Sequence, residues 1–193
     1  MGVPQEKAPL TVDEYLEIER AALEKSEFYR GEMYAMAGAS RRHNILAGNT
    51  FRLLANHLLG KECRPYMADM RLHIKAREHY TYPDVLVVCG ENSYDDEDNA
   101  NDATVIVEVL SSSTESYDRG RKFLHYRSLP SFQEYVLLSQ EDMLVEVFRR
   151  GQGGDWVYRA LTEPAAQLIL RSLDFSCTLA EIYESVAVSH DGA

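Results

Sequence analysis

The sequence predicts an α/β fold in which a central mixed β-sheet is flanked by helices. Two observations predict it. Short runs of β-branched and aliphatic residues bounded by turn formers are typical of buried strands, and a hydroxyl residue followed three positions later by glutamate is typical of a helix start. The chain has 193 residues, of which 45% are hydrophobic and 26% charged. This is enough for an ordinary core, so we expect one domain over residues 1–193.

Helix starts are predicted at three places, because a cap hydroxyl accepts a hydrogen bond from a free backbone N–H while the glutamate reaches back to the cap. They give helices over about 12–25 and about 112–129, the latter closed by Pro130, and a helix from 178. Apolar residues at helical spacing predict a further helix over about 42–59. The three pairs are Thr11 with Glu14, Ser112 with Glu115, and Thr178 with Glu181.

Strands are predicted between these helices. Alternation of apolar and polar residues over 69–75 predicts a strand with one wet or functional face, and the runs 85–88 and 104–110 predict buried strands. Residues 133–138 and 144–149 are typical of a hairpin, and 156–160 of a last strand. From the helix over 42–59 to the hairpin the order is then α, β, β, β, α, β, β, which gives a mixed sheet between helices.

Charge is unevenly distributed along the chain. The net charge of −11 argues against a generic nucleic-acid coat protein, whose affinity depends on neutralising phosphates. Residues 91–102 hold many acids and no base, and we expect a solvated loop there rather than a calcium site, since the spacing of an EF-hand loop is missing. A basic face is expected from 41–77, where the bases Arg41, Arg42, Arg52, Lys61, Arg64, Arg71, Lys75 and Arg77 outnumber the acids Glu62 and Asp69.

The cysteines and the hydropathy of the chain indicate which cellular compartment to expect for the protein. Cys63, Cys89 and Cys177 are an odd number at wide spacing, so we predict buried thiols and neither a disulfide framework nor a zinc knuckle. No stretch approaches the ~18 uninterrupted apolar residues of a membrane helix, and the first residues lack the pattern of a signal peptide. We therefore expect a soluble, cytoplasmic protein with no membrane partner.

Two carboxylates stand at the predicted buried strands. Asp84 directly precedes the run 85–88, and Glu108 lies inside the run 104–110. An ionised carboxylate there is costly unless something pairs with it, and a divalent metal is the natural partner, since Mg²⁺ needs few protein carboxylates and keeps several waters. The alternatives are a turn-capping role for Asp84 and an ion pair of Glu108 with an arginine such as Arg71 or Arg119.

Pro83-Asp84 before an apolar strand, followed by Glu108 in mid-strand, resembles the PD-(D/E)XK restriction-endonuclease-like superfamily. The third element of that motif is a lysine two residues after the second acid, and this position is Leu110 here. The longer string from Ile106 to Glu115, continued by Tyr117-Asp118-Arg119-Gly120-Arg121-Lys122-Phe123, closely resembles the Uma-two family of putative restriction endonucleases. In that branch the following helix supplies the lysine, and Lys122 is the match.

The resemblance covers about 11–186 and implies a restriction-endonuclease-like core. It implies that Asp84 and Glu108 bind Mg²⁺ or Mn²⁺, and that Asp84, Glu108 and Lys122 are the catalytic residues of an endonuclease that hydrolyses DNA phosphodiester bonds. Taken alone, Lys122 is a solvated helix lysine paired with Asp118. The second-tier candidates are Glu27 and Glu32, in a segment similar to the family's opening strand, and His43, where its first helix is entered.

Other classes of protein fit the same sequence. A catalytically silent DNA-binding or assembly module that retains the nuclease fold is favoured by the net acidity and by the lack of a recognisable target-recognition domain. A hydrolase of another phosphate ester is a third interpretation. A homodimer is expected for an enzyme that cuts both strands, because enzymes with a single active site generally need two copies for that reaction.

Overall fold

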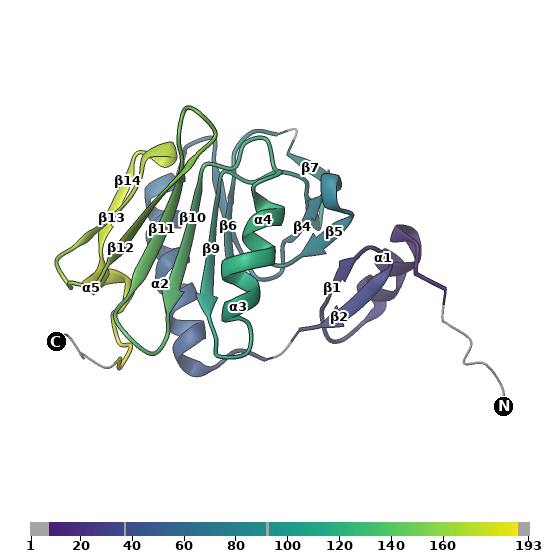
Figure 1. Cartoon of the computed structure of the whole chain (residues 1–193), viewed down its shortest axis with the longest axis horizontal. Coiled ribbons are helices and arrows are strands. Elements are labelled where there is room, and N and C mark those ends of the chain that lie inside the picture. The colour runs from purple at the N-terminus through teal and green to yellow at the C-terminus, as the bar shows by residue number, and fades with distance from the viewer. Residues whose placement is uncertain (1–7, 37, 92, 189–193) are drawn as a thin grey trace.

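A computed structural model describes residues 8–36, 38–91 and 93–188 of the chain. Within these residues the strands form two six-stranded sheets and one two-stranded hairpin, and helices lie against them (Figure 1). Both large sheets mix parallel and antiparallel pairs. The predicted mixed α/β class is therefore confirmed.

The first large sheet, here named the core sheet, holds the longest strands. Its order is β12 (Trp156–Leu161), β11 (Val145–Arg150), β10 (Glu134–Ser139), β9 (Val105–Leu110), β6 (Val85–Val88) and β3 (Arg64–Met67). β9 runs parallel to β10, whereas β6 and β9 are antiparallel. The predicted hairpin is confirmed in β10 and β11, and the predicted last strand in β12.

The two faces of the core sheet pack against different helices. Successive side chains of a strand point to opposite faces. Val105, Val107 and Val109 of β9 therefore share a core with the apolar residues of α2 (Arg41–Leu58), while Ile106 and Leu110 share another with α4 (Phe123–Tyr126). Figure 1 shows α2 behind this sheet and the segment from α3 to α4 in front of it. Glu108 has the same parity as Ile106 and so belongs to the α4 face.

The second large sheet, here named the lateral sheet, has short strands. Its order is β2 (Glu32–Ala35), β1 (Ser26–Tyr29), β5 (His79–Thr81), β4 (Arg71–Ile74), β8 (Asn99–Ala100) and β7 (Tyr94–Asp96). α1 (Val12–Ala21) packs on it through Tyr15, whose ring stacks on Phe28 at 4.9 Å and lies 5.4 Å from that of Tyr80. This small aromatic core fixes β1, and with it Glu27.

The helices start largely as predicted. Complete capping boxes are present at Thr11 and Thr178, where the hydroxyl and glutamate bond each other's backbone. No helix of the described ranges is long and apolar enough to cross a bilayer. The remaining elements are the hairpin β13 (Gln167–Leu170) and β14 (Phe175–Thr178), the short helix α5 (Leu179–Ile182), and the single turns η1 (Lys75–Arg77) and η3 (Arg171–Leu173).

The helix predicted from Ser112 is different in the structure. Helical backbone begins only with α3 (Glu115–Tyr117), and Ser111 rather than Ser112 supplies the hydroxyl, which accepts from the Thr114 N–H at 3.2 Å. A wide π-helical turn, η2 (Asp118–Lys122), then separates α3 from α4. Such turns are frequent at functional sites, because the extra residue changes the direction of the side chains that follow.

The acidic segment 91–102 is not the solvated loop that its composition predicts. It contributes β7 and β8, and its carboxylates pair with cations from other elements. Asp95 lies 2.8 Å from the Lys75 ammonium, and Asp98 lies 3.0 Å from the guanidinium of the buried Arg71. The face of β4 predicted to be wet is therefore largely buried, because these acids neutralise it.

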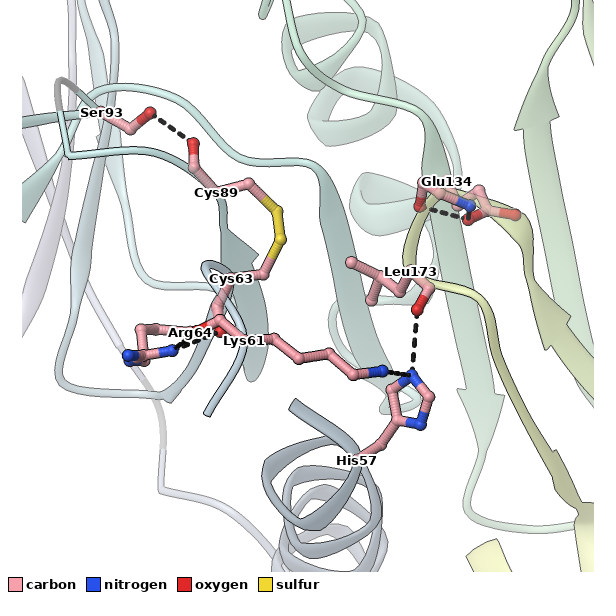
Figure 2. The surroundings of a disulfide bond; sticks show 9 residues. His57, Lys61, Cys63, Arg64, Cys89, Ser93, Glu134 and Leu173 are labelled. Atoms are coloured by element: carbon pink, nitrogen blue, oxygen red, sulfur yellow. Dashed lines mark hydrogen bonds between the residues drawn. A yellow bond between two sulfur atoms is a disulfide. The ribbon is translucent and has the colours of Figure 1, made fainter. Parts of the chain in front are cut away.

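The prediction of three free thiols is wrong for two of them. Cys63 and Cys89 form a disulfide, and only Cys177 is a free, buried thiol within the described residues (Figure 2). The reason is the antiparallel pairing of β3 with β6, in which Arg64 faces Val88. One step further this register places Cys63 opposite Cys89.

Candidate active site

Asp84 and Glu108 face each other at the edge of the β6–β9 pair. The antiparallel register joins Val85 to Val107, and one more step brings Asp84 opposite Glu108. Each carboxylate accepts from the other strand. The N–H of Val109 donates to Asp84 Oδ2 at 2.8 Å, and the N–H of Asp84 donates to Glu108 Oε2 at 3.3 Å. The two acids predicted from the strand pattern are therefore neighbours in space.

Glu108 is buried among polar groups from the α4 face. Its Oε1 accepts a hydrogen bond from the hydroxyl of Tyr126 at 2.6 Å and lies 3.0 Å from the ammonium of Lys122. Burial raises the pKa of Glu108 above its ordinary value, although Lys122 opposes the shift, and the negative charges of Asp84 and Asp118 add to it. A cation added beside this carboxylate would relieve both the desolvation and the repulsion.

Lys122 occupies the centre of a group of acids. Its Nζ lies 3.0 Å from Glu108, 3.4 Å from Glu27 and 3.5 Å from Asp118. Burial disfavours the ammonium, but these acids, Glu108 foremost, outweigh it and raise the pKa of Lys122 well above its ordinary value. The solvated helix lysine expected without the family resemblance is therefore wrong, because η2 turns Lys122 inward and leaves it 7% exposed.

Glu27 reaches the same group from β1 of the lateral sheet. It accepts hydrogen bonds from the hydroxyls of Thr81 and, at 3.4 Å, Tyr117, and its Oε2 lies 3.8 Å from His79. Burial would raise the pKa of Glu27, but Lys122, His79 and Thr81 lower it to about 2. Glu27 is thus ionised at neutral pH and belongs to the group of acids around Lys122.

The two remaining candidates lie in different places. His43, in the first turn of α2, has its Nε2 3.1 Å from Asp84 Oδ2. Glu32 lies on β2, where its carboxylate accepts from the hydroxyl of Tyr34, and within the described residues it forms no hydrogen bond or ion pair with Asp84, Glu108 or Lys122. The structure therefore brings His43 and Glu27 to the acids and leaves Glu32 outside.

Two members of the cluster were not singled out as site residues from the sequence. Asp118 is 3% exposed, and burial raises the pKa of its carboxyl against the opposing charge of Lys122. Tyr126 is fully buried. Their spacing from Lys122, four residues on either side, was the available signal. It was not decisive, because burial depends on how the segment docks on the sheet.

The arginines considered as partners of Glu108 are engaged elsewhere. Arg71 pairs with Asp98 and donates to the hydroxyl of Tyr82 at 2.9 Å, while Arg119 pairs with Glu115 at 2.8 Å and with Glu146. Half of the bases expected to form the basic face over 41–77 are also neutralised. Acids pair with Arg42, Arg52, Arg71 and Lys75.

The donors present suit a hard divalent cation. Asp84 and Glu108 offer carboxylate oxygens from adjacent strands, and Asp118 adds negative charge close to both. Mg²⁺ takes oxygen ligands and is commonly held by one or two carboxylates with waters completing its shell. No three His, Cys, Asp or Glu side chains are gathered as a metal site in the described part of the chain. The fit therefore depends on the pair Asp84 and Glu108.

The core sheet is mixed and has helices on both faces. It carries two facing strand carboxylates, and a buried helix lysine lies beside them. These features define a protein with a restriction-endonuclease-like fold. The chain resembles a crystal structure described as a putative nuclease belonging to DUF820 from Anabaena variabilis ATCC 29413, with a TM-score of 0.75 at 16% identity over 93% of this chain and 100% of that one. At this identity the likeness shows the fold alone. The chain belongs to the Uma2 family, described as putative restriction endonuclease, whose model matches residues 12–180.

Two curated relatives come from Synechocystis sp. (strain ATCC 27184 / PCC 6803 / Kazusa). The uncharacterized protein slr1290 is 34% identical over 181 residues, which cover 92% of this chain and 93% of the relative. The uncharacterized protein sll1609 is 38% identical over 161 residues, which cover 82% and 91%. Both matches extend over nearly the full length of these proteins, so the relationship concerns the whole fold and not a local motif.

Proposed function

We propose that this protein is a metal-dependent endonuclease that hydrolyses phosphodiester bonds in DNA. One observation carries the proposal: the Asp84 N–H donates to the Glu108 carboxylate, the Val109 N–H donates to the Asp84 carboxylate, and the Lys122 ammonium lies 3.0 Å from Glu108. Membership of the Uma2 family supports the same reaction class. The arrangement offers two of the things that phosphodiester hydrolysis needs, namely metal ligands and a cation for the phosphoryl oxygens, and a bound metal would supply the third, an activated water.

In this proposal Asp84 and Glu108 hold Mg²⁺ or Mn²⁺. When bound, such an ion lowers the pKa of a coordinated water and polarises the phosphate. Lys122 balances the negative charge that grows on the phosphoryl oxygens, or orients the attacking water. Glu27 and Asp118 hold the Lys122 side chain in place through contacts of 3.4 and 3.5 Å with its ammonium. The hydroxyl of Tyr126 fixes the orientation of the Glu108 carboxylate. His43 positions Asp84 through its 3.1 Å contact.

The proposal includes two features of the whole molecule. A homodimer would bring two active sites to the two strands of a duplex, which light scattering of the purified chain would measure. A cytoplasmic location, where DNA is present, would expose Cys63 and Cys89 to reducing thiols. The redox state of this pair in cells, read by alkylation of free thiols, tests that location.

Nicking of supercoiled plasmid tests the activity. Wild type should nick with Mg²⁺ or Mn²⁺ and stop when EDTA is added, whereas Asp84→Asn and Lys122→Ala should lose at least about 100-fold in rate. Asp142→Asn, an exposed aspartate at the β10–β11 turn, is the matched control and should cut like wild type. Circular dichroism of each variant checks its folding. Equal nicking by all four proteins would mean a contaminating nuclease and would refute the proposal.

One observation favours the catalytically silent DNA-binding or assembly module. Both oxygens of Glu108 already have partners within the protein: Tyr126 and Lys122 at Oε1, and the Asp84 N–H at Oε2. The fold therefore satisfies this carboxylate without a metal. Salt-dependent DNA binding by wild type, with no cleavage in any divalent ion, would select this second function.

A further inference from the structure

Three arginines lie in segments adjoining the elements that carry a pair of buried histidines next to the candidate active site, and all three act electrostatically on one of these histidines. They are Arg30 in the β1–β2 turn, Arg77 in η1 and Arg121 in η2. We propose that these three guanidinium groups bind a phosphate of the DNA backbone, on the strand that enters the site. The nature of the ligand rests on the proposed function, whereas the anion-binding character follows from the cluster itself.

The floor of this cluster is made of His79 and His125. Their Nδ1 atoms lie 3.0 Å apart, and the two side chains are 0% and 3% exposed. The ring of Tyr29 stacks on His125 at 5.0 Å and meets His79 edge-on at 5.6 Å. Nε2 of His79 is buried, forms no hydrogen bond among the described residues, and lies 3.8 Å from Oε2 of Glu27.

The arginines are brought to this floor by separate contacts. The guanidinium carbon Cζ of Arg30 lies 5.4 Å from the centre of the Tyr29 ring. The backbone N–H of Arg30 donates to the carbonyl of Glu78 at 3.1 Å, which ties the β1–β2 turn to the residue after Arg77. Arg121 precedes His125 by four residues along η2 and α4. All three arginines contribute, after burial and His79, to lowering the pKa of His125.

These arginines lack the acidic partners that some arginines of the described residues have. Arg30, Arg77 and Arg121 form no ion pair within the described residues, although Arg71, Arg119 and Arg149 do. The nearby Glu32 bonds to the Tyr34 hydroxyl instead. Nε of Arg77 is buried without a partner. Three unneutralised guanidinium groups in one place, on a chain of net charge −11, form a site for an external anion.

The chemistry of the cluster favours a phosphate. Guanidinium groups present planar forks that match phosphate oxygens in pairs, and Arg30 and Arg121 are exposed and so accessible to a polymer. The cluster is linked to the active site through Glu27, whose two oxygens lie 3.4 Å from Lys122 and 3.8 Å from His79. Arg121 is also the residue before Lys122. A DNA strand held by the three arginines would therefore lie next to the candidate active site.

Salt-dependent DNA binding tests the proposal. Binding of a fluorescent 30-base-pair duplex is measured by anisotropy in EDTA, over a range of NaCl concentrations, for wild type, Arg30→Gln, Arg121→Gln and the double variant. Each arginine removed should make the slope of log K against log salt shallower by about 1, and the double variant should bind at least about tenfold more weakly. Arg77→Lys keeps the charge without the fork and should lie between wild type and the others.

The matched control is Arg159→Gln, an exposed arginine on β12 with no ion pair in the described structure. The proposal is overturned if Arg30→Gln and Arg121→Gln have the slope and affinity of this control, or if the wild type does not bind the duplex. Plasmid nicking separates the two hypotheses. Arginine-dependent binding without cleavage would support the phosphate site and refute the nuclease activity. Cleavage by the wild type, with binding unchanged in the arginine variants, would support the nuclease activity and refute the phosphate site.

Discussion

The ammonium of Lys122 lies 3.0 Å from the Glu108 carboxylate, and both side chains are buried on the α4 face of the core sheet. A buried charge pair of this kind is costly to break, because the partner that remains has lost both water and counter-charge. The relationship therefore links the stability of the fold to the residues of the proposed active site. It also explains why Leu110, at the usual lysine position of the motif, does not leave the site without a cation.

Removing the ammonium should destabilise the protein. We expect Lys122→Ala to lower the free energy of unfolding in urea by about 3–5 kcal/mol, because Glu108 would remain buried without its cation. The double variant Lys122→Ala with Glu108→Gln should recover part of that loss, since no unpaired carboxylate remains. A double variant less stable than the single one would show that the pair is not coupled in this way.

Divalent metal should stabilise the fold through Asp84 and Glu108. Ligands that bind only the native state add about 2.7 kcal/mol at 100 times their Kd, so Mn²⁺ should raise the melting temperature of wild type. Glu108→Gln and Asp84→Asn should lose this increase, while Asp142→Asn should keep it. The same increase in all four proteins would place the ion elsewhere.

Removing the buried hydroxyl of Tyr126 should cost more unfolding free energy than removing an exposed or half-exposed hydroxyl. It donates to Glu108 at 2.6 Å in a fully buried setting. We expect Tyr126→Phe to cost about 1.5–3 kcal/mol of unfolding free energy, as for hydrogen bonds to charged groups. Tyr158→Phe removes a 2.8 Å bond to Glu146 from a tyrosine that is 53% exposed, and it should cost less. Equal losses would contradict the role of burial.

Reduction of the disulfide should weaken the protein without unfolding the site first. The bond between Cys63 and Cys89 closes a loop across 26 positions and fastens the edge strand β3 to β6. Reductant should lower the unfolding free energy by about 2–4 kcal/mol, measured in urea with and without dithiothreitol. Cys63→Ser with Cys89→Ser should be insensitive to the reductant, and a remaining sensitivity would implicate other chemistry.

Stability should depend on pH through His125. Burial, then His79 and the three arginines, lower its pKa to about 4. The unfolded chain therefore binds this proton at higher pH than the folded chain. The contribution of His125 is complete above pH ~6.5 and is lost as the pH falls from ~6.5 to ~4. Over this interval the unfolding free energy of His125→Gln should fall less steeply than that of wild type, and parallel curves would refute the assignment.

Local patterns predicted much of the fold. The strands 85–88 and 104–110, the hairpin of β10 and β11, and the capped helices at Thr11 and Thr178 depend on contacts between residues near in sequence or on strict alternation. The same alternation identified Asp84 and Glu108, because a carboxylate in an apolar run is conspicuous. Of the lateral sheet, local patterns predicted only β4, since segments of two to four residues carry too little periodicity.

The sequence by itself thus determined the mixed α/β class, the two strand carboxylates and, through the resemblance of the Ile106–Phe123 string, the lysine. The tertiary structure alone decided which residues join them. Glu27 arrives from the lateral sheet, Asp118 and Tyr126 are buried by the way the segment 115–126 docks, and Cys63 meets Cys89 through strand register. These contacts join residues far apart in the chain or depend on docking, and local patterns in one sequence do not contain that information.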